Sequence, residues 1–182
     1  RSSDLNDYDT IQNLKEKYDS ALIDDRIVGL DIATRPDCIN ENVAKLISSY
    51  MPKYKVFVEL GLQTSNDSTG SLINRGYDSS KFTEAVSILN KYNIPVICHI
   101  MVGLPTENTM VSVQETIDGK TYDFRVFKDI IETIKFINKH NVSGIKIHST
   151  YVVKNTKLNN MYENGEYTPI AYDEYMENLV YI

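Results

Sequence analysis

Charged and polar side chains fall on one side of four short apolar segments of this chain. In residues 56–63, Glu59 and Gln63 share one face of an expected strand and aliphatic residues share the other, because successive strand side chains point to opposite sides. The segments 27–33, 94–103 and 144–150 repeat the pattern with Asp31, with His99, and with Lys146 and His148. Carboxylates, imidazoles and an amine on a shared face can bind hydroxyl groups and amines, or ligate a divalent metal ion.

Glu59 is the residue of this set that most needs a partner. It lies one strand repeat before Gly61, deep on the polar face, and a buried carboxylate must be paired or protonated. Arg35, Arg75 and Lys146 are the candidate partners. Glu59 therefore forms an internal salt bridge or contacts a bound amine or ribose hydroxyl.

Strands with one aliphatic and one polar face are typical of the wall of a βα barrel. Apolar residues at helical spacing between the strands predict helices at about 7–22, 43–50, 82–89 and 127–137. This alternation indicates an α/β fold, with parallel strands, helical crossovers and helices outside. We expect a partial TIM-like (βα) barrel, a single domain over residues 1–182 that is a fragment of a complete barrel.

Residues 110–126 do not follow the helical pattern. Asp118-Gly119 is the strongest hairpin signal in the chain, and folding about it sets Val113 opposite Phe124. We therefore predict an inserted β-hairpin at about 110–126, on the rim where the strands end. Such an insertion is either a lid or an inert decoration.

Composition limits the classes of partner. The net charge of -6 argues against a broad nucleic-acid surface, although a small basic groove for a polynucleotide is compatible with it. The longest apolar stretch, 94–105, is interrupted by His99 and is shorter than the roughly 20 residues of a membrane span. Arg1 in place of a starting methionine suggests that upstream sequence has been removed. We expect a cytoplasmic protein without membrane contact.

The two cysteines, Cys38 and Cys98, are far apart in sequence. Neither belongs to a CxxC pair, so the thiols of this chain cannot by themselves build a zinc site or a cluster-binding loop. We expect two free thiols in a reducing compartment and no metal ligand in this chain.

Four ordered blocks carry a resemblance to a known family: GLDIATRPDCI, VELGLQTSNDSTGSLINRGYD, CHIMVGLPTE and GIKIHSTYVVKNTKL. They resemble radical S-adenosylmethionine (SAM) proteins of the YhcC-like group, which are related to coproporphyrinogen oxidase HemN and the catalytic subunit of Elongator. The resemblance spans roughly residues 27–158. It implies an incomplete six-stranded barrel in which the strands here are the third to sixth. It also implies a [4Fe-4S] cluster, held by a CxxxCxxC loop after the first strand.

The resemblance also implies cofactor contacts. Gln63 matches a glutamine near the ribose of SAM, and Arg75 matches an arginine near its carboxylate. His99 stands where relatives carry a ribose-binding aspartate, and Gly103 and Leu104 match a motif whose main chain backs the adenine.

One expected contact is absent from the sequence. Ala33 stands where relatives of the HemN and Elongator type carry a ribose-binding glutamate, so Thr34 or His99 is the candidate replacement. The side chains expected to face substrate are Glu59, Lys146, His148 and Tyr151.

The resemblance implies a parent enzyme that reductively cleaves SAM to a 5′-deoxyadenosyl radical, which abstracts hydrogen from a substrate. The CxxxCxxC loop is missing here, so we expect this fragment not to bind the cluster and to be inactive alone.

Two alternatives stay open. One is a metal-dependent hydrolase or lyase barrel with Asp31, Glu59, His99 and His148 as ligands. The other is a non-catalytic module that docks a partner, or a second copy, along a free strand edge.

Overall fold

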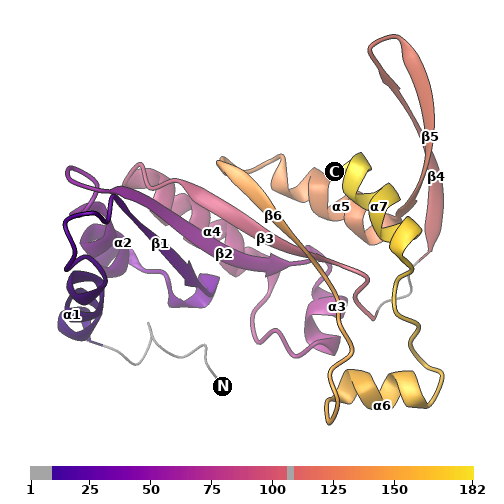
Figure 1. Ribbon diagram of the computed structural model, residues 1–182, viewed down its shortest axis with the longest axis horizontal. Helices are drawn as coiled ribbons and strands as arrows, with labels where there is room; N and C mark the ends of the chain where they lie inside the picture. Colours follow the sequence, from indigo (N-terminus) through magenta and orange to yellow (C-terminus); the bar gives the residue numbers. More distant parts are fainter. Residues whose placement is uncertain (1–9, 106–108) are drawn as a thin grey trace. The chain divides into compact units, whose positions relative to one another are not determined.

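The structure is a computed structural model that describes residues 10–105 and 109–182 (Figure 1). Helices and strands alternate along the chain, as the sequence predicts. The elements are α1 (Ile11–Ala21), β1 (Gly29–Thr34), η1 (Pro36–Cys38), α2 (Glu41–Ser48), β2 (Lys55–Gln63), α3 (Asp67–Leu72), α4 (Ser79–Lys91), β3 (Val96–Val102), β4 (Met110–Ile117), β5 (Lys120–Phe127), α5 (Lys128–Ile137), β6 (Gly144–Ser149), α6 (Lys157–Glu163) and α7 (Tyr172–Tyr181). The expected start of the first helix, at residue 7, lies outside the described residues.

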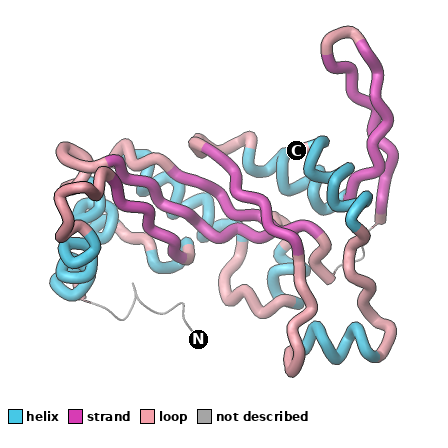
Figure 2. The backbone as a smooth tube through the Cα atoms, viewed as in Figure 1, coloured by secondary structure: helices cyan, strands magenta, loops and turns pink. Residues whose placement is uncertain are grey.

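Four strands form one sheet in the order β1-β2-β3-β6 (Figure 2). β1 and β2 pair in parallel, with Gly29 beside Lys55 and Thr34 beside Leu60. Helices connect the strands, as parallel pairing requires. The predicted α/β fold with four parallel strands is therefore confirmed.

The two faces of the sheet differ as the alternation predicts. In β1, Leu30 and Ile32 are buried while Asp31 and Ala33 are exposed. In β3, every second residue from Val96 to Val102 is buried. Helices α2 and α4 lie behind the sheet in the view of Figure 1, and their own apolar stripes are buried. Burial of the aliphatic face leaves the polar face as the place for a site.

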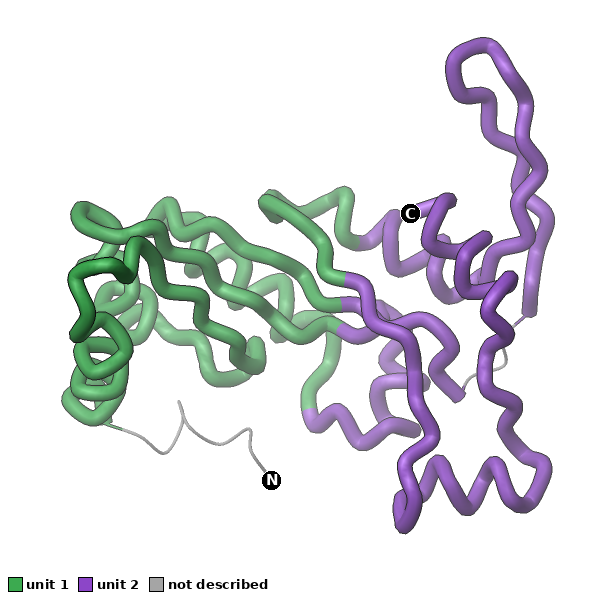
Figure 3. The backbone as a smooth tube through the Cα atoms, in the orientation of Figure 1, with its two compact units in different colours: residues 1–62, 77–99, 137–146 green, residues 63–76, 100–136, 147–182 purple. Residues whose placement is uncertain are grey.

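The chain divides into two compact units (Figure 3). Unit 1 comprises residues 1–62, 77–99 and 137–146, and unit 2 comprises residues 63–76, 100–136 and 147–182. Strands β2, β3 and β6 each contribute residues to both units.

Unit 2 contains the predicted hairpin. β4 and β5 pair antiparallel, with Val113 opposite Phe124. Asp118 and Gly119 form the turn with φ of 50° and 76°, the left-handed values that a tight hairpin turn requires. Phe124 is buried, and its ring meets the ring of Tyr181 of α7 edge to face at a centroid distance of 6.1 Å. The root of the hairpin is therefore part of the core of unit 2.

No helix in the described part of the chain is long and apolar enough to cross a membrane.

Candidate functional site

Three of the predicted site residues meet in unit 1, around Glu59. Its side chain is 9% exposed, and both its carboxylate oxygens accept hydrogen bonds of 3.0 Å from Nζ of Lys146. Nε2 of His99 lies 2.8 Å from Oε2 of the same carboxylate. The structure thus selects Lys146 among the three candidate partners. Glu59 forms an internal salt bridge.

Asp31 of β1 extends this cluster to a fourth strand, because its carboxyl group hydrogen-bonds Glu59. Loss of part of its hydration, and then the charge of Glu59, raise the pKa of Asp31. Burial alone would also raise the pKa of Glu59, but Lys146 and His99 outweigh it and lower that pKa. A hydrogen bond between two carboxyl groups needs one proton. These opposite shifts mean that, as the pH falls, Asp31 takes up a proton before Glu59 does.

The metal-dependent alternative is not supported by this arrangement. Lys146 places its ammonium group against both oxygens of Glu59, where a metal ion would have to bind. Across residues 10–105 and 109–182, no group of three or more His, Cys, Asp or Glu side chains could hold a metal ion.

A second set of contacts in unit 1 was not expected from the sequence. Arg35 pairs with Asp37, and its guanidinium carbon lies 5.2 Å from the ring centroid of Tyr77. Tyr77 in turn donates a 2.6 Å hydrogen bond to the carbonyl oxygen of Gly61, on β2. The TRPD segment thus helps to fix β2. Thr34, the first residue of this segment, ends β1 and is half-buried.

The other predicted cofactor contacts belong to unit 2. Gln63, at the end of β2, has a φ of 65°, which a residue with a side chain adopts only at a cost. Gly103, just after β3, has a φ of 84°. A Cβ atom there would lie 2.9 Å from Cγ2 of Ile170, so only glycine fits. Leu104 is buried.

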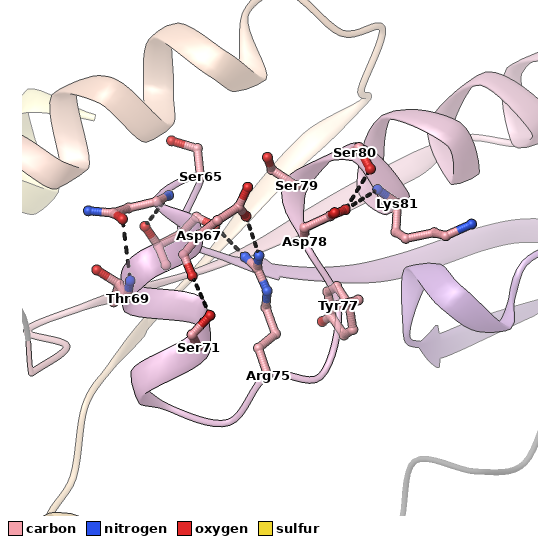
Figure 4. A network of polar contacts seen from close by, with 12 residues as sticks. Ser65, Asp67, Thr69, Ser71, Arg75, Tyr77, Asp78, Ser79, Ser80 and Lys81 are labelled. Atoms are coloured by element: carbon pink, nitrogen blue, oxygen red, sulfur yellow. Dashed lines mark hydrogen bonds and ion pairs between the residues drawn. The ribbon is translucent and has the colours of Figure 1, made fainter.

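Arg75 lies in a network of its own in unit 2 (Figure 4). Its side chain is 2% exposed and donates 2.7 Å hydrogen bonds to the carbonyl oxygen of Thr64 and to Oδ1 of Asp67. A Cβ on Gly70 would lie 2.8 Å from its guanidinium carbon. The guanidinium group therefore packs against α3 and fixes the loop that follows β2.

Two predicted substrate-facing residues, His148 and Tyr151, are exposed at the end of β6 and after it. Tyr151 is 78% exposed. Both belong to unit 2.

Unit 2 also holds a polar groove of about 780 Å³, between the loop after β2, α3 and the start of α5. Ser65, Thr69, Lys128, Asp129 and Glu132 are among its lining residues. None of the predicted site residues lines it, and no sequence pattern indicates it.

The sequence profile of the radical SAM superfamily matches residues 4–118. The chain belongs to the radical SAM superfamily. A profile of the radical SAM C-terminal domain matches residues 142–182. The predicted family is therefore confirmed.

Two relatives match nearly the whole chain. YtqA of Bacillus subtilis is 34% identical over 172 residues, which are 94% of this chain and 48% of YtqA. YhcC of Escherichia coli is 31% identical over 166 residues, which are 91% of this chain and 48% of YhcC. The chain thus spans about half the length of these relatives. The solved structure of an N-terminally truncated Elp3 from the archaeon Methanocaldococcus infernus matches with a TM-score of 0.64 and 25% identity, covering 85% of this chain and 32% of that one.

The radical SAM family name implies two cofactors, and the described residues fit them differently. A [4Fe-4S] cluster needs thiolates, yet Cys38 and Cys98 are both buried, and burial raises the pKa of Cys98. These residues therefore do not supply the ligands of a cluster. The ionised Glu59 can accept hydrogen bonds from hydroxyl or amine groups, which SAM carries.

Proposed function

We propose that this radical SAM chain supplies part of the barrel wall that binds SAM and a substrate in a radical SAM enzyme. The observation that carries the proposal is the row Asp31, Glu59, His99 and Lys146, one residue from each strand of the sheet, on the face opposite the helices. Four strands that each contribute one polar side chain to a common face build a binding surface rather than a core.

Each side chain of the row has a role in the proposal. Glu59 accepts a hydrogen bond from a ligand hydroxyl or amine, while Lys146 and His99 keep it ionised. Asp31 takes up a proton more readily than a free aspartate and, when protonated, can donate a hydrogen bond to a ligand atom. When bound, SAM and its cluster supply the radical chemistry that abstracts a hydrogen atom.

The remaining predicted contacts enter the proposal from the resemblance. Gln63 serves the ribose, and the main chain of Gly103 and Leu104 the adenine. Arg75, whose guanidinium group bonds Thr64 and Asp67, supports the carboxylate site through the loop after β2. Thr34 is the candidate replacement for the missing glutamate. The resemblance also makes Lys146, His148 and Tyr151 candidates for contact with the substrate.

Binding of S-adenosylhomocysteine, which cannot be cleaved, tests the proposal in the full-length protein with its cluster reconstituted. Calorimetry should give saturable binding to the wild type. Glu59→Gln should weaken it about tenfold, the effect of a lost charged hydrogen bond. Glu166→Gln, a change at an exposed carboxylate of unit 2, is the matched control and should leave binding unchanged. Absence of saturable binding to the wild type would overturn the proposal.

Association through the outer edge of the sheet stays a prediction. β1 and β6 are the edge strands of this sheet, and unpaired backbone groups at such edges favour pairing with another chain. Light scattering of the full-length protein over a concentration series measures whether copies associate.

A further inference from the structure

The carbonyl groups at the end of β3 are held by residues that follow β6. The hydroxyl of Tyr167 donates a 2.7 Å hydrogen bond to the carbonyl oxygen of Gly103. Thr150 donates to the carbonyl oxygen of Val102 twice, from its amide and from Oγ1, each at 3.0 Å. All four residues belong to unit 2, so these contacts lie within one compact unit.

These bonds are buried. Tyr167 and Thr150 are each 7% exposed, and the bond of Tyr167 joins positions 64 residues apart in sequence. Burial raises the pKa of Tyr167, so its hydroxyl keeps its proton and stays a donor. A buried hydrogen bond is costly to leave unmade, because the carbonyl would lose its partner without gaining water.

Gly103 needs this support because of its backbone. Its φ of 84° is reached by glycine without a steric penalty, but glycine is also the most mobile residue when nothing restrains it. Ile170 closes one side, where a Cβ would meet Cγ2 at 2.9 Å. Tyr167 fixes the direction of the carbonyl, and with it the plane of the peptide that joins Gly103 to Leu104.

We propose that Tyr167, with Thr150 beside it, is a positioning residue for adenine recognition by the main chain at Gly103 and Leu104. The inference rests on the proposed function, which assigns the adenine to that main chain. It extends the site to the part of the chain that matches the radical SAM C-terminal domain, residues 142–182. That part then sets specificity for the base without touching the ligand.

The test compares two ligands in the full-length protein with its cluster reconstituted. S-adenosylhomocysteine and S-inosylhomocysteine differ only at the base, so the ratio of their dissociation constants reports main-chain recognition of adenine. Tyr167→Phe removes only the hydroxyl. It should bring this ratio of dissociation constants closer to one by a factor of about three to ten, the effect of one hydrogen bond. Tyr162→Phe, at a half-exposed tyrosine of α6, should leave it unchanged.

A purely structural role would weaken both ligands equally and leave the ratio intact, which would overturn the inference. A wild-type ratio near one would also overturn it, whereas a wild type that binds neither ligand would instead refute the proposed function. Hydrogen exchange should show faster deuterium uptake in residues 100–105 of the Tyr167→Phe variant. Should that variant fail to fold, Thr150→Val, which removes a hydroxyl donor to Val102, is measured instead, and an unchanged ratio there would overturn the inference.

Discussion

The ammonium group of Lys146 on β6 lies 3.0 Å from both carboxylate oxygens of Glu59 on β2, although β3 separates these strands in the sheet. A side chain that spans an intervening strand holds three strands together on one face. The pair is also asymmetric, because the side chain of Glu59 is 9% exposed and that of Lys146 is 46% exposed.

We expect Lys146→Met to destabilise the protein by about 1–2 kcal/mol, between the values for exposed and for buried ion pairs. Methionine keeps most of the aliphatic stem and removes the charge, so the loss comes from the carboxylate of Glu59, which loses its ammonium partner. Urea denaturation of the variant and wild type measures the difference. Lys154→Met, at an exposed lysine after β6, is the control and should change stability by less than about 0.5 kcal/mol. Equal effects of the two substitutions would show that Glu59 does not depend on Lys146.

Asp31 and Glu59 should give opposite dependences of stability on pH. The pKa of Asp31 is raised in the folded state, so its contribution is present at low pH and is lost as the pH rises through that raised value. The pKa of Glu59 is lowered, so its contribution is present at neutral pH and is lost as the pH falls through that lowered value.

Asp31→Asn therefore should stabilise the protein at pH 7, by a few tenths to about 1 kcal/mol, because it removes a like charge beside Glu59. At pH 3 the difference from wild type should vanish. Denaturation midpoints of the variant and wild type between pH 3 and 8 measure the difference in stability at both ends of this range. Asp25→Asn, at an exposed aspartate outside the cluster, is the control. Destabilisation by Asp31→Asn at pH 7 would show that the charge of Asp31 is favourably paired rather than repelled by Glu59.

Local patterns predict much of this structure because they depend on few residues. Strand alternation assigns Asp31, Glu59, His99 and Lys146 to one face, and the period of two leaves no other choice once one face is buried. Asp118-Gly119 fixes the register of the hairpin, because the two-residue turn determines which residues stand opposite each other.

Contacts between distant segments were not predictable in the same way. Three cations could have paired with Glu59, and only the folded sheet shows that Lys146 reaches it. The bonds from Tyr77 to Gly61 and from Tyr167 to Gly103 join segments that no periodicity relates. A tyrosine in a loop carries no sequence signal that distinguishes an anchor from an exposed ring.

We expect substitutions of Arg75 to show that its guanidinium group fixes the loop after β2. Arg75→Met should cost about 2–3 kcal/mol, because the carbonyl oxygen of Thr64 loses a buried donor and Asp67 loses its ion pair. Arg75→Lys should recover only part of the lost stability, since an ammonium group cannot reproduce the two-pronged geometry of a guanidinium group. Arg26→Lys, at a side chain that is 90% exposed, is the control and should cost little. Full recovery by lysine would show that charge alone matters at this position.

The two aromatic residues of β5 should differ sharply in what they contribute to unit 2. Phe124 is 8% exposed and packs edge to face on Tyr181 of α7, whereas Tyr122 is 43% exposed and stands opposite Glu115. Phe124→Ala leaves a cavity and should cost about 3–5 kcal/mol. Tyr122→Ala removes a partly exposed ring and should cost less than about 1 kcal/mol.

Limited proteolysis measures whether Phe124 and Tyr122 also differ in how much they stabilise α7. If Phe124 secures α7, its replacement should speed cleavage within residues 172–181 while Tyr122→Ala leaves the cleavage rate unchanged. Comparable stability losses in the two variants would mean that the hairpin is uniformly packed along its length. That outcome would contradict the division of the hairpin into a buried root and an exposed tip.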